Sequence, residues 1–333
     1  MSAEPVLTVP HDMQARRPRI EVGLSRVGVT GVEKVVRIAD GEREQLFYAE
    51  LECFVDLRAD QRGVHMSRFD EVIGEAIDEV VLSEAFKAET LATHIAERVR
   101  ERQGGMRSEV TIAARYPEHK PAPVSGSPTQ ELFTLFGSAV ASERGVRRLV
   151  GVQAQGMTAC PCAQELVAQG ARERLEEDGF TSAEVERVME VVPVATHNQR
   201  GVGTLHVGCP EGCGEPLEAS TLLAIVEAAM SSEIYERLKR SDEVEIVEKA
   251  HRRPRFVEDC VREMVRMGVE EFGSLGPGAF LMARQENLET IHQHNVIAER
   301  HGLLDGLRRE LEGDLDESGA HLTMRDWLEG RPA

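Results

Sequence analysis

The residues of this chain best suited to chemistry are two cysteines and a histidine. Cys160 and Cys162 flank Pro161 at the predicted start of a helix, and a helix N-terminus stabilises a thiolate that acts as nucleophile, redox group or metal ligand. His197 follows on a predicted strand. A thiolate, an imidazole and a carboxylate form a three-ligand set with an open position, which is typical of a catalytic metal. The candidate carboxylates lie in or before later helices: Glu243, Glu245, Glu248 and Glu258.

A second group of candidates lies towards the end of the chain. The pattern around Glu289, His292 and His294 predicts a strand over residues 288–296, on which the two histidines point to the same face. Two imidazoles on one face suit proton transfer or metal binding.

Two further cysteines leave other uses of the thiols open. Cys209 and Cys213, together with Cys160 and Cys162, would form a structural four-cysteine zinc site, although these are not the usual paired spacings of such sites. Alternatively, Cys160 and Cys162 alone would form a redox pair.

The composition of the 333-residue chain is that of a folded protein, because 41% of the residues are hydrophobic and 29% are charged. The length favours about two domains. Without a membrane-spanning apolar run or a signal-peptide pattern, the sequence predicts a cytoplasmic protein with no membrane partner. The net charge of -19 disfavours binding to nucleic acid. With 34 Arg and only 5 Lys, the acidic surface suggests an organism with a salty cytoplasm.

Hydrophobic periodicity predicts the same order of elements in both halves of the chain. Two strands, two helices and two strands are predicted in the first half, at residues 27–38, 45–57, 67–80, 90–103, 108–116 and 131–141. Between the last two strands, a proline-rich segment over residues 117–128 is predicted to be a loop. The corresponding elements of the second half fall at residues 148–157, 194–207, 220–238, 255–267, 278–284 and 288–296.

This repetition predicts an α+β protein with an antiparallel sheet in each half. We expect a first unit over residues 1–145 and a second over residues 146–333. The second unit carries two inserted helices at about residues 163–190 and an acidic C-terminal tail.

Six motifs, in order along the chain, together resemble the metal-dependent GTP cyclohydrolases of type IB. The motifs are Gly63-Val64-His65-Met66-Ser67-Arg68, Cys160-Pro161-Cys162, His197-Asn198-Gln199-Arg200, Lys239-Arg240-Ser241-Asp242-Glu243, Pro254-Arg255-Phe256-Val257-Glu258-Asp259 and Ile291-His292-x-His294. The resemblance runs from about residue 17 to about residue 301. It is closest to the archaeal branch, or type IV, of methanopterin and folate synthesis. The feature that indicates this branch is the long distance of 35 positions from Cys162 to His197, which the two inserted helices fill. Ser241 stands where the family often has proline.

The resemblance implies a fold, an assembly and a set of site residues. The implied fold is the tunnelling fold, with two ββααββ units per subunit, antiparallel sheets and helices packed on one face. The implied assembly is a homodimer or larger homo-oligomer with active sites between subunits. Cys160, His197 and Glu243 correspond to metal ligands, Glu258 to the residue that binds guanine, and His65 to a substrate-pocket residue. The catalytic residues implied at the same site are Cys160, Cys162, Glu289, His292 and His294.

The implied reaction uses GTP and water. One carboxylate accepts both the N1–H and the 2-amino group of guanine. A bound Fe²⁺, with Mn²⁺ or Zn²⁺ as alternatives, makes hydroxide available for attack on guanine C8 at neutral pH. The imidazole ring opens, formate is released, and the ring recloses to 7,8-dihydroneopterin 2′,3′-cyclic phosphate plus diphosphate. The alternatives are 7,8-dihydroneopterin triphosphate as the product, for folate synthesis, or a metal-binding protein of this fold without catalysis.

Overall fold

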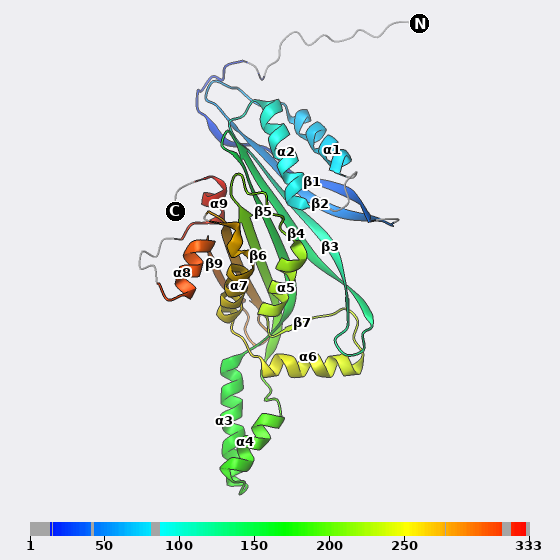
Figure 1. The fold of residues 1–333 in the computed structure, drawn as a ribbon, viewed down its shortest axis with the longest axis vertical. Helices are drawn as coiled ribbons and strands as arrows, with labels where there is room; N and C mark the ends of the chain where they lie inside the picture. Colours follow the sequence, from blue (N-terminus) through cyan, green and yellow to red (C-terminus); the bar gives the residue numbers. More distant parts are fainter. Residues whose placement is uncertain are drawn as a thin grey trace. The chain divides into compact units, whose positions relative to one another are not determined.

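The computed structural model describes residue 14 and residues 16–40, 43–80, 87–276, 278–314 and 321–330. Within these residues, nine strands form one antiparallel sheet in the order β1-β2-β3-β4-β5-β6-β8-β9, and the short strand β7 pairs with β5 (Figure 1). The strands are β1 (Leu24–Asp40), β2 (Arg43–Leu57), β3 (Ser108–Pro121), β4 (Pro128–Ser142), β5 (Gly145–Ala159), β6 (Asn198–Cys209), β7 (Ser232–Glu233), β8 (Phe280–Leu288) and β9 (Val296–Leu303).

The chain divides into two compact units. The first comprises Met1–Ala113 and Gly137–Arg148, and the second comprises Ala114–Phe136 and Leu149–Ala333. Strands β3, β4 and β5 therefore contribute residues to both units. The expected boundary between residues 145 and 146 stays a prediction.

The first unit has its core between two helices and the strands. Helices α1 (Met66–Val80) and α2 (Ala88–Gln103) place Phe69, Leu91 and Ile95 in fully buried positions. Leu91 and Ile95 lie four positions apart in α2, as Phe69 and the buried Ile73 do in α1, so each helix buries one apolar stripe. Helix α2 ends at Gly104, whose left-handed backbone (φ 69°) favours glycine and lets its N–H reach the last carbonyl groups.

In the second unit, two helices pack against one face of β6, β8 and β9. They are α5 (Ala219–Ala229) and α7 (Val257–Phe272). Helix α7 turns Cys260, Met264 and other apolar residues to the sheet, while its charged residues face away. The N-terminal end of α7 lies beside the ends of β6 and β8, where the candidate site is found.

The C-terminal residues pack on the sheet through one tryptophan. Trp327, in helix α9 (Met324–Leu328), is 1% exposed and stacks on Phe280 with ring centroids 5.5 Å apart. Its indole N–H donates to the carbonyl of Gly278 at 2.8 Å. A Cβ atom at Gly208 would lie 2.6 Å from the indole ring, so this position of β6 requires glycine. Helix α8 (Leu304–Leu311) joins β9 to the acidic tail, of which residues 315–320 and 331–333 lie outside the described residues.

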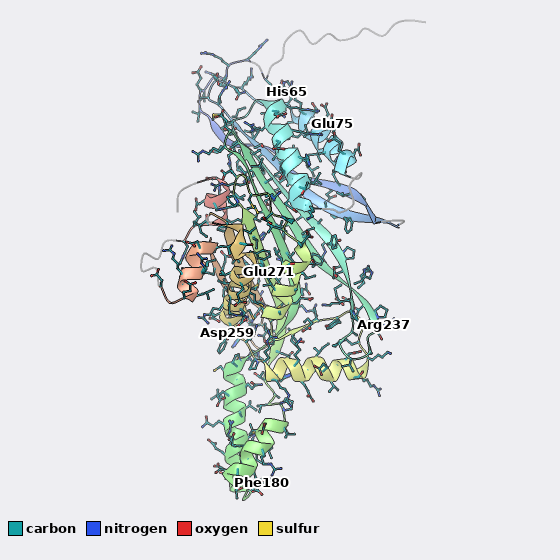
Figure 2. The ribbon with its side chains drawn as sticks, in the orientation of Figure 1. His65, Glu75, Phe180, Arg237, Asp259 and Glu271 are labelled. Carbon is teal, nitrogen blue, oxygen red and sulfur yellow. The ribbon has the colours of Figure 1, made fainter. Side chains whose placement is uncertain are left out.

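The insertion in the second unit is a helical hairpin. Helices α3 (Pro161–Glu177) and α4 (Ser182–Val191) extend away from the sheet, with Phe180 in the turn at their tip (Figure 2). Each buries one residue, Ala168 in α3 and Val185 in α4. Among the helices that the structure describes, none has both the length and the apolar character required to cross a membrane.

The structure corrects the predicted fold class. The expected pair of ββααββ units, each with its own antiparallel sheet, is wrong, because one nine-stranded sheet contains the described strands of both halves. The second half also contains an additional strand, β7, and an additional helix, α6 (Arg240–Arg252). Periodicity identifies a strand from its own residues but does not reveal which strand edges pair. The α+β composition and the antiparallel strands agree with the prediction.

Three predicted elements differ from the observed ones. The predicted loop at residues 117–128 is shorter, because β3 continues to Pro121 and β4 begins at Pro128. The predicted helix at residues 220–238 ends at Ala229. The predicted strand at residues 288–296 is an exposed bend between β8 and β9.

Candidate active site

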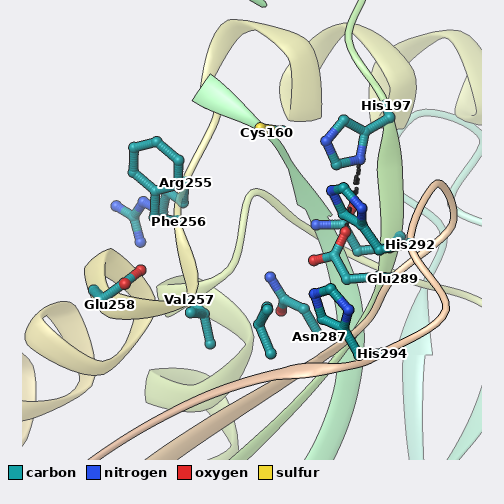
Figure 3. Close-up of a pocket in the computed structure, with 12 residues that line it drawn as sticks. Cys160, His197, Arg255, Phe256, Val257, Glu258, Asn287, Glu289, His292 and His294 are labelled. Atoms are coloured by element: carbon teal, nitrogen blue, oxygen red, sulfur yellow. Dashed lines mark hydrogen bonds and ion pairs between the residues drawn. The ribbon is translucent and has the colours of Figure 1, made fainter. Parts of the chain in front are cut away.

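A cavity of about 260 Å³ in the second unit contains most of the predicted site residues (Figure 3). It opens beside the N-terminal end of α7, next to the ends of β6 and β8 and the bend that follows β8. Its lining consists of Cys160, His197, Gln199, Arg255, Phe256, Val257, Glu258, Asn287, Glu289, His292, His294 and Val296. We refer to this cavity as the site pocket.

Cys160 is the N-cap residue of helix α3. Pro161 follows at the first helical position, where its missing N–H costs nothing. The backbone of Cys160 is fixed on both sides, because its N–H donates to the His197 carbonyl at 3.1 Å and its carbonyl accepts from the Thr196 hydroxyl at 2.8 Å. Its side chain makes no capping hydrogen bond, which leaves the sulfur directed to the pocket. Cys162 is exposed on α3 and does not line the pocket.

His197 has a fixed ring orientation. Its Nδ1 lies 3.1 Å from the side-chain oxygen of Gln199. An Nδ1–H that donates to this oxygen leaves the Nε2 lone pair free for a ligand. A carboxylate oxygen of Glu289 lies 3.9 Å from the same Nδ1. This oxygen is buried and has no hydrogen-bond partner in the part of the chain that the structure describes, so it is a free acceptor at the pocket.

Glu258 lies in the first turn of α7, where the helix dipole favours a negative charge. The preceding Arg255 is not directed at a ligand, because its guanidinium donates to the carbonyl groups of Ala228 at 3.2 Å and Ala229 at 2.5 Å. Arg255 therefore ties the start of α7 to the end of α5. This contact holds Glu258 on the wall of the pocket (Figure 3).

His292 and His294 line the pocket, although not from a strand. They lie in the exposed bend at residues 289–295, where their rings stack with centroids 5.3 Å apart and an interplanar angle of 13°. The prediction of a shared strand face was wrong. Alternating residues in a polar bend give the same sequence pattern as a half-exposed strand.

Besides Cys162, two predicted site residues lie outside the site pocket. Glu243 is exposed on the first turn of α6. His65 belongs to the first unit and precedes α1, where its backbone N–H and carbonyl bond to the side chain of Gln103 at 3.2 and 2.8 Å. Their assigned roles stay predictions.

The residue next to Glu243 has a structural role that the sequence did not reveal. Asp242 is buried, and it accepts hydrogen bonds from the backbone N–H groups of Val124, Ser125 and Lys239 at 2.7 to 2.9 Å. Burial alone raises the pKa of Asp242, but these hydrogen bonds outweigh it and lower the pKa below its ordinary value. Asp242 thereby fixes the start of α6 to the turn between β3 and β4.

The α3–α4 insertion is connected to the site in two places. One is the first turn of α3, and the other is the segment between the end of α4 and His197, which we call the return segment. The amide of Gln164, in α3, donates to the carbonyl groups of Val194 at 2.7 Å and His251 at 2.6 Å. Arg252 donates to the carbonyl groups that end α4, at 3.1 and 2.9 Å. These contacts fix the segment that leads into His197 against the first turn of α3, which follows Cys160.

The donor types of the pocket suit a divalent metal. Cys160 supplies a sulfur, His197 an imidazole nitrogen and Glu289 a carboxylate oxygen that accepts no hydrogen bond within the described residues. Across the described ranges, however, no three His, Cys, Asp or Glu side chains are grouped closely enough to hold an ion. The pocket thus has the chemistry of a metal site without a complete ligand set in the described chain.

Comparison with known protein families decides what this pocket belongs to. Residues 11–298 match the family model of the type I GTP cyclohydrolase folE2. The chain belongs to this family. The family assignment makes it a GTP cyclohydrolase, and therefore a hydrolase, as its six motifs predict. The family is metal-dependent in general.

Curated relatives support the family assignment over nearly the whole chain. The chain is 38% identical to the GTP cyclohydrolase MptA of Methanococcus aeolicus over 308 residues, which cover 90% of this chain and 99% of the relative. It is 37% identical to the GTP cyclohydrolase MptA of Methanocaldococcus jannaschii, over 90% of this chain and 97% of the relative. The predicted resemblance to the archaeal branch of the family is confirmed.

Solved structures share the fold of this chain at low sequence identity. The uricase of Arthrobacter globiformis superimposes with a TM-score of 0.51 over 93% of this chain and 99% of that chain. Only 8% of the residues are identical, so the likeness concerns the fold alone.

The alternative sites built from Cys209 and Cys213 receive no support. Cys209 is buried at the end of β6, Cys213 follows in the next turn, and neither lines the site pocket. Within the described residues, no three His, Cys, Asp or Glu side chains are grouped around them closely enough to hold a metal ion.

Proposed function

We propose that this GTP cyclohydrolase converts GTP and water into 7,8-dihydroneopterin 2′,3′-cyclic phosphate, formate and diphosphate, the first step of a methanopterin or folate-type pterin pathway. The observation that supports this proposal best is the site pocket, because it combines Glu258 with Cys160 and His197 in one cavity. The relatives named MptA come from methanogenic archaea, which favours this product over a retained triphosphate.

Glu258 binds the guanine base in this proposal. Its carboxylate accepts the N1–H and the 2-amino group side by side, and adenine does not offer this pair of donors. The position on the first turn of α7 supports the role, since Arg255 fixes this turn and the carboxylate lines the pocket.

Cys160 and His197 would hold the metal, with Glu243 as the third ligand implied by the family. Fe²⁺ is the first candidate, and Mn²⁺ or Zn²⁺ are alternatives, because thiolate, imidazole and carboxylate suit all three. When bound, the metal supplies Lewis acidity for the addition of water to guanine C8. Gln199 holds the His197 ring so that Nε2 faces the ligand.

The remaining site residues move protons. His292 and His294 lie at the mouth of the pocket and suit delivery of protons to the imidazole nitrogens during ring opening. Glu289 offers its free oxygen as an acceptor inside the pocket. Cys162 and His65 complete the proposed set, each from outside the pocket.

We further propose a homodimer or larger homo-oligomer with active sites between subunits. The incomplete ligand set of the described chain supports this assembly, because a neighbouring subunit would close the site. The compartment stays a prediction, namely the cytoplasm.

The product is tested by mass spectrometry after anaerobic incubation with GTP and Fe²⁺. A cyclic phosphate together with free diphosphate is the expected result. A product that retains all three phosphates would contradict the proposed product and indicate 7,8-dihydroneopterin triphosphate, as in folate synthesis. The protein treated with a chelator serves as the control.

A further inference from the structure

The α3–α4 insertion leaves much of its apolar surface exposed. Helix α3 buries one of its 17 residues, and helix α4 buries one of its 10. The large apolar residues exposed on this hairpin are Leu166, Val167, Phe180, Val191 and Val192. Most of the stability of a helix in a protein comes from the packing of its apolar face. A hairpin with so little of that face packed has surface left for a further partner.

A cavity of about 370 Å³ runs along this hairpin, and we refer to it as the hairpin groove. Its α3 side is apolar at Val167, Ala171 and Leu175, and its α4 side is apolar at Val188 and Met189. The lining positions of α3 are four residues apart, so the groove follows the helix axis. From residue 167 to residue 178 it extends about 16 Å, or roughly three helical turns.

Two opposite charges lie at the outer end of the hairpin groove. Arg174 and Asp178 both line it, four positions apart on one face of α3. Arg172 pairs with Glu186 at 3.2 Å, whereas the side chains of Arg174 and Asp178 form no ion pair within the described residues. A second α3, antiparallel and related by a two-fold axis, would bring Arg174 of each copy to Asp178 of the other. The charges of this face are therefore complementary to the same face of another copy.

An aromatic ring stands at the tip of the hairpin, two positions beyond Asp178. Phe180 is 43% exposed in the turn between the helices (Figure 2). Its backbone N–H donates to the Leu175 carbonyl at 3.1 Å, which fixes the turn. In the antiparallel arrangement that pairs Arg174 with Asp178, Phe180 of one copy lies level with residues 171–172 of the other. The ring would thus meet the apolar groove beside the small side chain of Ala171.

We propose that the α3–α4 hairpin is a contact surface between two copies of this chain. Phe180 of each copy enters the hairpin groove of the other, and Arg174 of each pairs with Asp178 of the other. The hairpin carries both the ring and the groove, and both charges, so it matches itself as a two-fold contact requires. The inference adds a specific surface to the proposed homo-oligomer and does not depend on the reaction with GTP.

The first test removes the ring and measures the mass of the full-length protein against its concentration, by analytical ultracentrifugation. The wild-type assembly should separate at this contact on dilution. For Phe180→Ala, the dissociation constant of this step should rise by about 30-fold or more, the loss typical of a central interface residue. The matched control is Val191→Ala, since Val191 is an exposed apolar residue of the same hairpin that does not line the groove. Its dissociation constant should equal that of the wild type.

The second test exchanges the charges at about 0.1 M KCl, where screening extends over roughly 10 Å. Arg174→Asp and Asp178→Arg should each associate more weakly than the wild type, because like charges then face each other. An equimolar mixture of the two variants should associate again, because the facing charges are then opposite, and a variant that fails to fold would not be rescued in this way. Arg187→Asp makes the same charge change at an exposed hairpin position outside the groove, and it should have no effect.

Two results would overturn the inference, and they differ in what they say of the proposed assembly. If Phe180→Ala and both charge variants keep the wild-type mass at every concentration, copies do not meet at this hairpin, and the proposed homo-oligomer forms through another surface. A wild-type protein that is monomeric throughout the concentration series would overturn the proposed homo-oligomer together with this contact. Neither result bears on the proposed reaction, which formate release measures separately.

Discussion

Hydrogen bonds to neighbouring residues fix the orientation of individual residues in the site pocket. His197 receives its ring orientation from Gln199, and both backbone groups of Cys160 are bonded to Thr196 and His197, just before β6. Side chains that are held in this way lose little entropy when they bind a ligand, which favours a tight and specific site. At this scale the most informative side chain is Glu258.

We predict that Glu258→Gln lowers kcat/KM for GTP by about 10⁴-fold, because an amide accepts only one of the two guanine donors and opposes the other with its own N–H. Steady-state formate release measures the effect. Glu270→Gln is the matched control, since Glu270 lies on the same helix and only pairs with Arg266 on the exposed face. Near-normal turnover in Glu258→Gln would show that this carboxylate does not bind the base.

The neighbouring acids Asp242 and Glu243 show what sequence alone does not reveal about a residue. The motif that contains them identifies an important turn. Which carboxylate is buried depends on the turn at Val124 and Ser125, more than 100 positions earlier in the chain. Similarly, no pattern in the sequence marks Asn287 as a pocket residue, because its place depends on the glycines of β6.

At the scale of elements, the sequence predicts the start of helix α3 better than the end of α5 or the pairing of strands. The start of α3 was predicted correctly because Pro161 and the preceding Cys160 mark it directly. Helix α6 was not predicted, because it is strongly charged and buries only Asp242, Ile246 and Ala250. A helix with so narrow a buried stripe has almost no hydrophobic periodicity to detect.

The α3–α4 insertion acts on the site through Gln164, so we predict a defect at a distance. Gln164→Ala removes both hydrogen bonds that fix the return segment. We expect the affinity for Co²⁺ to fall by about 10-fold, which is the smaller of the losses typical when a residue that supports a metal ligand is removed. Titration with Co²⁺, followed by the absorption of the cobalt–thiolate bond, gives the affinity without an activity assay.

The matched control is Gln169→Ala, which removes an exposed glutamine of the same helix that bonds only to Glu173 at 3.0 Å. The affinity of this variant should equal that of the wild type. Equal affinities in all three proteins would show that the insertion does not position Cys160 and His197.

At the scale of the whole molecule, one buried histidine makes stability depend on pH. His206 on β6 packs against Phe136, with the centroids of the two rings 5.3 Å apart. Its Nδ1 has no hydrogen-bond partner within the described residues. Burial lowers the pKa of His206 to about 4, from an ordinary value of 6.5. The unfolded chain therefore binds the proton more readily than the folded chain between these two values.

We predict that the free energy of unfolding falls by about 3 kcal/mol through this residue as the pH drops from about 6.5 to 4, and that no loss from it occurs above pH 6.5. Denaturant unfolding of the wild type and of His206→Phe over this range measures the difference. The free energy of unfolding of His206→Phe should not show this decrease between about pH 6.5 and 4, since phenylalanine does not titrate. Parallel pH profiles for the two proteins would contradict the assignment.

The net charge of -19 predicts a second property of the whole molecule. Repulsion among the carboxylates opposes folding at low ionic strength, and about 1 M salt shortens the screening length to roughly 3 Å. We expect the midpoint of thermal unfolding to rise steadily with KCl up to molar concentrations, as measured by circular dichroism. A midpoint that is independent of KCl, or that falls, would argue against adaptation to a salty cytoplasm.

Our central proposal is that the imidazole ring of GTP is opened in the site pocket, where Cys160 and His197 would hold the metal and Glu258 would bind the base. Its most direct test is the release of labelled formate from GTP labelled at C8, under anaerobic conditions with Fe²⁺ and molar KCl. We predict formate in a one-to-one ratio with a fluorescent pterin after oxidation, and loss of both in His197→Ala. Folded wild-type protein that releases no formate with Fe²⁺, Mn²⁺ or Zn²⁺ would contradict the account.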